Sequence, residues 1–188
     1  MGRIVVTEFV SLDGVMEAPA PDGSGYPHAG WSFDFSQGEE GERFKLEEAL
    51  ASDAALLGRV TYEAFAQAWP NAEGEMADKF NGMPKYVISS TLKDPEWNNT
   101  TVLTGDVAHE VASLKKQHDG DIVVHGSARL VHELLELDLV DELRLMVFPV
   151  VLGSGKRVFP EMSDKHPLQL VDSKTTGDGV MILVYGRR

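Results

Sequence analysis

Apolar residues recur along the chain in two spacings, and the change from one spacing to the other predicts the secondary structure. Short runs rich in β-branched residues indicate strands, whereas apolar residues three or four positions apart indicate helices. The predicted strands are 3–10, 54–57, 86–89, 101–103, a run that begins at 122, 142–151, 168–173 and 180–185. The predicted helices are 38–51, 62–68, 76–81, 107–116 and the segment that follows 128.

The order of these elements predicts the fold class. Strands alternate with helices over most of the chain, and a run of strands closes it. This order is typical of an α/β fold with a mostly parallel central sheet, an antiparallel edge strand near the C-terminus and flanking helices. The chain has 188 residues and shows no internal repeat or linker, so we expect one domain over residues 1–188.

The segment 122–137 is the one around which the predicted sheet is organised. A short apolar run ends in Gly126-Ser127-Ala128, and apolar residues at helical spacing follow at once. The first N–H groups of a helix have no partner within the helix, so a turn of this kind can bind an anion. The alternative is a tight strand–helix corner that binds no ligand.

Two further turns carry related chemistry. The segment 58–61 (GRVT) opens a predicted helix, and Ser89 and Ser90 follow a predicted strand. Because parallel strands bring their carboxyl ends to one edge of a sheet, we expect the three turns to lie together. Two helix starts suit a pyrophosphate, whereas Arg59 and the nearby hydroxyl groups suit an additional monophosphate. A dinucleotide with a ribose 2′-phosphate is the simplest ligand that carries both groups.

The composition of the chain argues against several classes of binding partner. The net charge is −13, from 17 Lys plus Arg and 30 Asp plus Glu, which argues against nucleic-acid binding. The cations near predicted turns, Arg59, Lys85 and Arg129, are the candidates for contacts with a small phosphorylated ligand. No apolar run is long enough to cross a membrane, and no export signal is evident, so we expect a cytoplasmic protein. The absence of cysteine excludes thiolate chemistry, and the histidine spacing predicts no metal site.

The segment 16–31 is long and rich in Gly, Pro and Ala. A loop of this length within one domain is usually either functional or disordered. Its aromatic residues Tyr26, His28 and Trp31 favour an ordered loop or a closing lid, and a surface insertion is the alternative.

Four segments in their order along the chain resemble a known family. They are SLDG (11–14), LLGRVTYE (56–63), YVISST (86–91) and LVDELRLMVFPVVLGSG (139–155). The chain resembles the dihydrofolate reductase-like superfamily over nearly its whole length. More closely, it resembles the RibD C-terminal family, to which the reductase domain of riboflavin biosynthesis belongs. The resemblance implies a three-layer dihydrofolate reductase-like fold, NADPH as the hydride donor and a pteridine- or pyrimidine-like substrate.

The same resemblance implies a cofactor site. Its pyrophosphate and 2′-phosphate contacts would be Gly58, Arg59 and Thr61. Its contacts at the adenosine end would be Ser89 and Ser90. Its contacts under the pyrophosphate and the nicotinamide ribose would be Gly126, Ser127 and Ala128. Backbone groups of Phe9 and Val10 would line the nicotinamide, and Asp13 would stand at the start of a mobile loop.

The chain departs from these families at two points. Dihydrofolate reductases usually have a Gly-Gly pair where this chain has Gly126-Ser127, which leaves the conformation of that peptide bond open. The bifunctional riboflavin enzymes also carry a zinc deaminase domain, and this chain has neither the cysteines nor the length for it.

Hydride transfer to a C=N bond also requires a proton, which a carboxyl group can supply. Asp34 is the first candidate for this catalytic role and Glu8 the second, although either could be an ordinary surface acid. Trp31 and His125 are the predicted substrate contacts, and a buried core histidine is the alternative for His125. Tyr62, followed by aromatic residues at 65 and 69, favours core packing over a base-stacking platform.

The leading hypothesis is therefore an NADPH-dependent reductase of a small heterocycle, and the alternative is a non-catalytic nucleotide-binding protein on the same fold. A protein-interaction module is the third possibility, favoured only by the acidic composition. The apolar segment 148–151 contains Pro149 and is predicted as an edge strand at a homodimer contact, because related reductases commonly form dimers.

Overall fold

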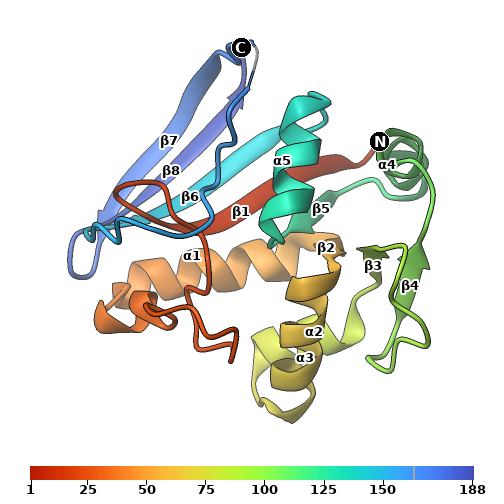
Figure 1. Cartoon of the computed structure of the whole chain (residues 1–188), viewed down its shortest axis with the longest axis horizontal. Helices are drawn as coiled ribbons and strands as arrows, with labels where there is room; N and C mark the ends of the chain where they lie inside the picture. The colour runs from red at the N-terminus through yellow and green to blue at the C-terminus, as the bar shows by residue number, and fades with distance from the viewer. Residues whose placement is uncertain (163) are drawn as a thin grey trace.

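The computed structural model describes residues 1–162 and 164–188. A single eight-stranded sheet in the order β4-β3-β2-β5-β1-β6-β8-β7 runs through the molecule (Figure 1). The strands are β1 (Arg3–Ser11), β2 (Ser52–Gly58), β3 (Lys85–Ile88), β4 (Thr100–Leu103), β5 (Asp121–Val124), β6 (Glu142–Phe148), β7 (Leu168–Thr176) and β8 (Val180–Arg187). The helices are η1 (Trp31–Asp34), α1 (Gly38–Ala51), α2 (Arg59–Ala68), η2 (Trp69–Asn71), α3 (Glu75–Gly82), α4 (Val107–Gln117) and α5 (Ala128–Glu136).

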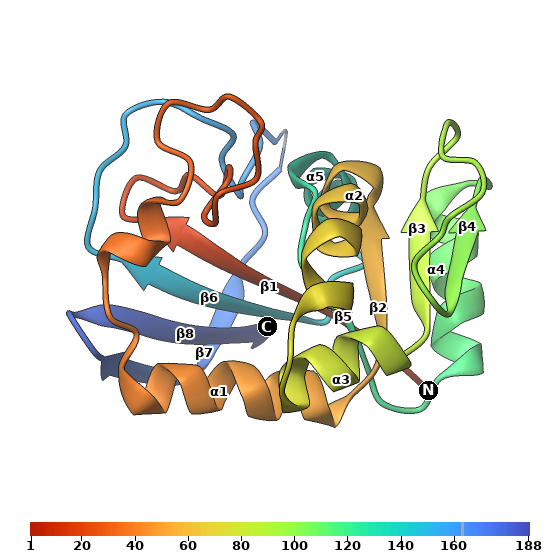
Figure 2. The same ribbon diagram turned by 90° about the horizontal axis from the view of Figure 1, so that it is seen from below.

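Strand directions agree with the predicted fold class. Neighbouring strands from β4 to β6 run parallel, whereas β8 runs antiparallel to both β6 and β7. Figure 2 shows α1, α2 and α3 on one face of the sheet, with α5 behind it. The prediction of an α/β sheet with helices on its faces and an antiparallel C-terminal part is confirmed.

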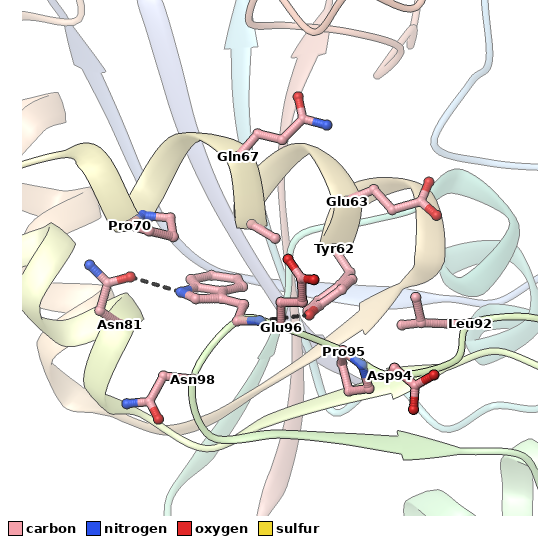
Figure 3. A pocket seen from close by; sticks show the side chains of 12 residues that line it. Tyr62, Glu63, Gln67, Pro70, Asn81, Leu92, Asp94, Pro95, Glu96 and Asn98 are labelled. Atoms are coloured by element: carbon pink, nitrogen blue, oxygen red, sulfur yellow. Dashed lines mark hydrogen bonds between the residues drawn. The ribbon is translucent and has the colours of Figure 1, made fainter.

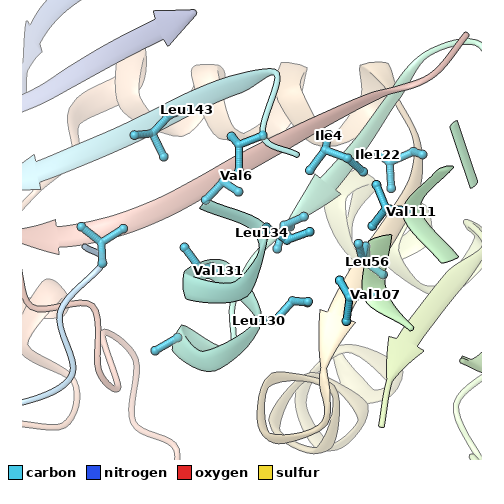
Figure 4. Packing of buried hydrophobic residues seen from close by; sticks show 14 of the residues in the cluster. Ile4, Val6, Leu56, Val107, Val111, Ile122, Leu130, Val131, Leu134 and Leu143 are labelled. Atoms are coloured by element: carbon cyan, nitrogen blue, oxygen red, sulfur yellow. The ribbon is translucent and has the colours of Figure 1, made fainter. Parts of the chain in front are cut away.

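The alternation of side chains along each strand places buried clusters on both faces of the sheet. Ile4 and Val6 of β1 pack under α4 and α5, together with Leu134 of α5 (Figure 4). Val5 points to the opposite face and packs in a second cluster with Tyr62 and its aromatic neighbours. Tyr62, Phe65 and Trp69 therefore pack in or against this cluster, as their helical spacing predicted.

The predicted edge strand at 148–151 is wrong. Strand β6 ends at Phe148 and lies between β1 and β8, so it is an interior strand. Phe148 is fully buried and its ring packs against Phe9 and Trp31. Pro149 lies just after the strand, where it removes no hydrogen bond from the sheet.

The long loop 16–31 is held by hydrogen bonds at several points. The indole N–H of Trp31 donates to the carbonyl of Glu17 at 2.9 Å. The hydroxyl of Ser32 donates to the carbonyl of Pro19 at 2.8 Å, and the hydroxyl of Tyr26 to that of Ser154 at 2.7 Å. The loop is therefore ordered and folds back on itself and on the segment after β6. Within the part of the chain that the structure describes, no helix has the length and apolar character to cross a membrane.

Lys85 was predicted as a possible phosphate contact, and the structure contradicts this. The side chain is fully buried, and its ammonium donates to the carbonyls of Phe80, Asn81 and Met83 at 2.7, 3.3 and 2.9 Å. It also lies 4.4 Å from the centre of the Trp97 ring. Lys85 therefore caps the carboxyl end of α3 and is not accessible to a ligand.

Replacing Lys85 by methionine should lower the free energy of unfolding by about 2 kcal/mol, because buried carbonyls at the end of α3 lose their donor. Chemical denaturation measures the loss. Lys116→Met, at an exposed position of α4, is the matched control and should change little. Equal stability of the two variants would contradict a capping role for Lys85.

Candidate functional site

The three predicted turns meet at the carboxyl edge of the sheet. Strand β2 pairs with β3 up to Gly58 and Ile88, and with β5 up to Leu56 and Val124. Because these neighbouring strands are parallel, the residues that follow them emerge on the same side. Gly58, Ser89 and Gly126 therefore lie along one edge of the sheet.

Gly58 and the Gly126-Ser127 turn are in direct contact. The N–H of Gly58 donates to the carbonyl of Gly126 at 3.1 Å, and the N–H of Thr61 donates to the hydroxyl of Ser127 at 3.4 Å. A Cβ atom at Gly58 would lie only 2.3 Å from Oγ of Ser127. Gly126 has φ of +97°, and its peptide bond to Ser127, which the sequence left open, is cis. The close approach therefore requires glycine at both positions.

This contact brings the starts of α2 and α5 together. Gly58 is the N-cap residue of α2 and has no side chain. Ser127 is the N-cap residue of α5, and its hydroxyl accepts no hydrogen bond from α5 itself. By contrast, Asp106 at the start of α4 accepts a hydrogen bond from the N–H of His109 at 3.0 Å. The N–H of Thr61 donates to the Ser127 hydroxyl, and the other first-turn N–H groups of α2 and α5 can donate to an anion. Ala128 is the first residue of α5.

The predicted monophosphate contacts surround this point. Arg59 is exposed, and its guanidinium donates to the Glu63 carboxylate one turn later in α2 at 2.8 Å. The Ser89 hydroxyl accepts hydrogen bonds from the N–H groups of Thr91 and Leu92, at 3.2 and 2.9 Å, which fixes the turn after β3. Ser90 is exposed beside it. A phosphate at Arg59 would compete with Glu63 for the guanidinium.

Strand β1 offers an open side at the same edge. It pairs with β5 from Arg3 to Val6, whereas its pairing with β6 continues to Ser11. In the described residues, the backbone from residue 7 onward therefore has no strand partner on the β5 side. The predicted nicotinamide contacts Phe9 and Val10 lie in this open stretch, where backbone groups are available to a ligand.

Asp13 fixes the turn that follows β1. Its carboxylate accepts hydrogen bonds from the Ser11 hydroxyl at 2.6 Å and from the N–H groups of Leu152 and Gly153 at 3.1 and 2.8 Å. These hydrogen bonds lower the pKa of the Asp13 carboxyl to about 2, and the bond from Ser11 has the largest effect. Asp13 therefore ties the start of the loop to the segment after β6. In this structure it acts as a structural anchor, and a contact with cofactor stays a prediction.

The two candidate acids occupy very different surroundings. Asp34 ends η1 and is exposed, and its carboxylate makes no hydrogen bond or ion pair among the described residues. Glu8 is 7% exposed, and its Oε1 is buried without a hydrogen-bond partner in the described chain. That atom lies 3.8 Å from the position a Cβ at Gly126 would take. Burial raises the pKa of the Glu8 carboxyl well above its ordinary 4.5, and the charge of Lys45 offsets this only in part.

The two predicted substrate contacts are both largely enclosed. Trp31 is 3% exposed and packs edge-on against Phe148 with 5.4 Å between ring centres, so it anchors the loop in the core. His125 lies between Phe65 and Phe80, at 5.8 and 5.4 Å between ring centres, and its Nε2 has no partner in the described residues. Burial, aided by the charge of Lys45, lowers the pKa of His125 to about 3. The imidazole is therefore neutral at physiological pH.

A polar cluster on the inner face of α1 escaped the sequence analysis. The ammonium of Lys45 donates to the Thr7 hydroxyl at 2.7 Å and to the buried carboxylate of Glu48. It also lies 5.6 Å from the centre of the Phe9 ring. Not every apolar residue of this helix is buried, since Leu50 is 46% exposed. The only signal in the sequence was the spacing of Lys45 and Glu48 three residues apart, which is common on solvated helices.

A cavity of about 680 Å³ lies elsewhere, between α2 and the loop after β3 (Figure 3). None of the predicted site residues lines it. Its lining includes the acids Glu63, Asp94 and Glu96, which would repel a phosphate. This cavity therefore does not coincide with the candidate cofactor site.

The sheet order, the helix starts at its carboxyl edge and the open side of β1 define an α/β domain of the dihydrofolate reductase-like class. The family model of the RibD C-terminal domain matches residues 3–182, and the chain belongs to this family. A curated relative, the uncharacterized protein YyaP of Bacillus subtilis, is 33% identical over 138 residues, which cover 71% of this chain and 73% of the relative.

Solved structures show the same fold at low sequence identity. A putative riboflavin biosynthesis protein from Shewanella sp. PV-4 superposes with a TM-score of 0.80 at 18% identity, covering 99% of both chains. Dihydrofolate reductase from Enterococcus faecalis, solved in complex with NADP(H) and RAB-propyl, superposes with a TM-score of 0.59 at 15% identity, covering 99% of this chain and 96% of the other. The predicted three-layer fold is confirmed by these likenesses.

Replacing Gly58 by alanine should lower the free energy of unfolding by about 1–3 kcal/mol, because the added methyl group collides with Ser127 and separates the starts of α2 and α5. Gly82→Ala is the matched control, since a Cβ at that last residue of α3 meets no atom within 4 Å. Urea denaturation of both variants tests the contact. A Gly58→Ala protein as stable as the control would show that the two turns are not tightly packed.

Proposed function

We propose that the protein is an NADPH-dependent reductase of a small heterocyclic substrate, of the pyrimidine or pterin type. The observation that carries this proposal is the contact of Gly58 with Ser127, which joins the starts of α2 and α5 at the carboxyl edge of the sheet. Membership of the RibD C-terminal family supports a reductase of this kind.

Different residues along this edge of the sheet would bind different parts of the cofactor. The N–H groups at the starts of α2 and α5 would hold the pyrophosphate, and Arg59 with Thr61 would hold the 2′-phosphate. The turn at Ser89 and Ser90 would lie at the adenosine. The open backbone at Phe9 would receive the nicotinamide. NADPH bound in this way would supply a hydride to the substrate.

The proton that completes the reduction needs a source, for which Asp34 and Glu8 are the candidates. The surroundings favour Glu8, because burial raises the pKa of its carboxyl well above the ordinary value and so favours the protonated form. Its buried Oε1 adjoins Gly126, at the edge where the cofactor is proposed to bind. Glu8 would deliver the proton directly or through a water molecule, whereas exposed Asp34 has no contact that orients it.

Replacing Arg59 by alanine should weaken NADPH binding by about tenfold, because one charge-assisted phosphate contact is lost at an exposed site. NADH lacks the 2′-phosphate and should bind the variant and the wild type equally. Titration by nicotinamide fluorescence measures both affinities, with the exposed Arg43→Ala on α1 as the control. Equal losses for NADPH and NADH would place the 2′-phosphate elsewhere.

Replacing Glu63 by glutamine should strengthen NADPH binding, whereas Arg59→Ala should weaken it. Since this carboxylate competes for the guanidinium of Arg59, its removal should strengthen NADPH binding roughly twofold, the effect of an exposed ion pair. The gain should vanish when Arg59 is also alanine. A gain that persists in the double variant would contradict competition for Arg59.

The state of Glu8 predicts a pH dependence of stability. The folded protein holds this proton more tightly than the unfolded chain, whose carboxyl titrates near the ordinary 4.5. Glu8 therefore contributes stability that is fully present below about pH 4.5 and is lost as the pH rises through the raised pKa. Glu8→Gln should remove this loss, whereas Glu47→Gln, exposed on α1, should follow the wild type. Thermal unfolding between about pH 4 and 8 compares the three, and parallel curves would contradict a raised pKa.

We also propose a homodimer, through the outer strands of the sheet. Leu168, Leu170 and Val171 on β7 and Met181 on β8 are 40%, 50%, 63% and 42% exposed. Strand β7 lies at the edge of the sheet, with no neighbouring strand on its outer side in the described residues. Sedimentation at micromolar concentration should show a dimer for the wild type and a monomer for Leu170→Lys. Leu50→Lys on α1 is the control and should remain a dimer. A monomeric wild type would overturn the dimer and leave the reductase proposal intact.

A further inference from the structure

A series of alternating charges crosses the sheet face that α1 covers, and it ends at Lys45. The guanidinium of Arg3 donates to Asp121 at 2.6 Å, and that of Arg144 donates to Asp121 at 3.0 Å and to Glu48 at 3.3 Å. Glu48 in turn accepts the short hydrogen bond from Lys45. Glu48 is the buried counter-charge of Lys45 and is itself held by Arg144, so the series fixes the position of Lys45.

Lys45 keeps one hydrogen-bond donor free. An ammonium has three N–H donors, and in the described residues Thr7 and Glu48 accept two of them. The side chain is 14% exposed and stands beside the ring of Phe9, in the stretch of β1 that has lost its β5 neighbour. A donor fixed in this way is suited to an acceptor on a bound ligand.

The charge of Lys45 is only partly neutralised. Burial alone would raise the pKa of Glu48, but the charges of Lys45 and Arg144 outweigh burial and hold that pKa below its ordinary value. The ionised carboxylate is thus shared between two cations. On a protein with a net charge of −13, an anionic ligand needs such a local cation to overcome the general repulsion.

His125 supplies a second unused polar group on the same face. Val123, two residues earlier in β5, packs in the cluster under α1 and α2, and the ring of His125 contacts Phe65 and Phe80 on that side. Its buried Nε2 lacks a partner in the described chain. A neutral imidazole nitrogen donates or accepts one hydrogen bond according to its tautomer. In the register of β1 and β5, Val5 pairs with Val123 and Val6 with Val124, so Thr7, which accepts from Lys45, and His125 come next on the two neighbouring strands. The two groups therefore flank one region.

From these contacts we infer that Lys45 and His125 together bind the substrate, and that Lys45 makes the site selective for an anionic heterocycle. The ligand presents a negatively charged oxygen to the free N–H of Lys45 and a ring nitrogen or N–H to Nε2 of His125. Its flat ring lies against Phe9 and Phe65. The identification of this ligand as the substrate rests on the proposed reductase function, whereas the anion selectivity is a property of the site alone.

Two pyrimidines that differ by one carboxylate provide the test. Orotate and uracil are titrated calorimetrically into the full-length protein, with and without saturating NADP⁺. The wild type should bind orotate at least about tenfold more tightly than uracil, the difference between a charge-assisted and a neutral hydrogen bond. Lys45→Met should abolish the preference, Lys45→Arg should retain most of it, and the exposed Lys116→Met should leave it unchanged. His125→Phe should weaken both ligands.

The outcomes separate this inference from the proposed function. A wild type without preference for orotate, or a preference that survives in a folded Lys45→Met protein, would overturn the inference even if NADPH binds normally. A preference that depends on Lys45 in a protein that binds no NADPH would support the anion site and overturn the reductase function. Circular dichroism of each variant checks that a lost preference does not come from unfolding. A Lys45→Met protein that fails to fold leaves the decision to Lys45→Arg, whose loss of preference would count against the inference.

Discussion

The contact between Gly58 and Ser127 is the constraint on which the candidate site depends. Two strand–helix turns meet so closely that a single methyl group at Gly58 would not fit, and the N–H of Gly58 is bound to the carbonyl of Gly126. Because of this contact, the first turns of α2 and α5 converge on one point and their unpaired N–H groups act together. The parallel order β5-β2-β3 then sets the turn at Ser89 along the same edge.

The second determinant is the polar interior of the α1 face. Most buried charges destabilise a protein unless each is paired, and here Glu48 has both Lys45 and Arg144 as partners. Near the ends of β1 and β5 this pairing becomes incomplete. On this face His125 keeps a polar atom without a partner in the described residues, and Lys45 keeps a donor. Unsatisfied groups of this kind are costly in a core, so their gathering beside the open side of β1 indicates a place where a ligand completes the hydrogen bonding.

The sequence was sufficient to predict most elements, the sheet class and the single edge that collects the turns, because apolar runs such as 3–10 and the glycines at the end of β2 and after β5 are local signals. The sequence was insufficient where the surroundings of a residue depend on how distant segments pack together. Pro149 suggested an edge, yet β6 is interior because β8 returns beside it. Lys85 appeared available near a turn, yet the carbonyls at the end of α3 enclose it. The role of Lys45 depends on Thr7 and Phe9, which are distant in sequence, so the helical pattern of α1 alone could not reveal it.

A crystal structure of the protein with NADP⁺ tests the convergence of the two helix starts most directly. The pyrophosphate should lie between the first turns of α2 and α5, within hydrogen-bond distance of their N–H groups, with the nicotinamide beside the open backbone at Phe9. Density for NADP⁺ in the acidic cavity lined by Glu63 and Trp97, or anywhere else while these helix starts bind only solvent, would contradict the assignment.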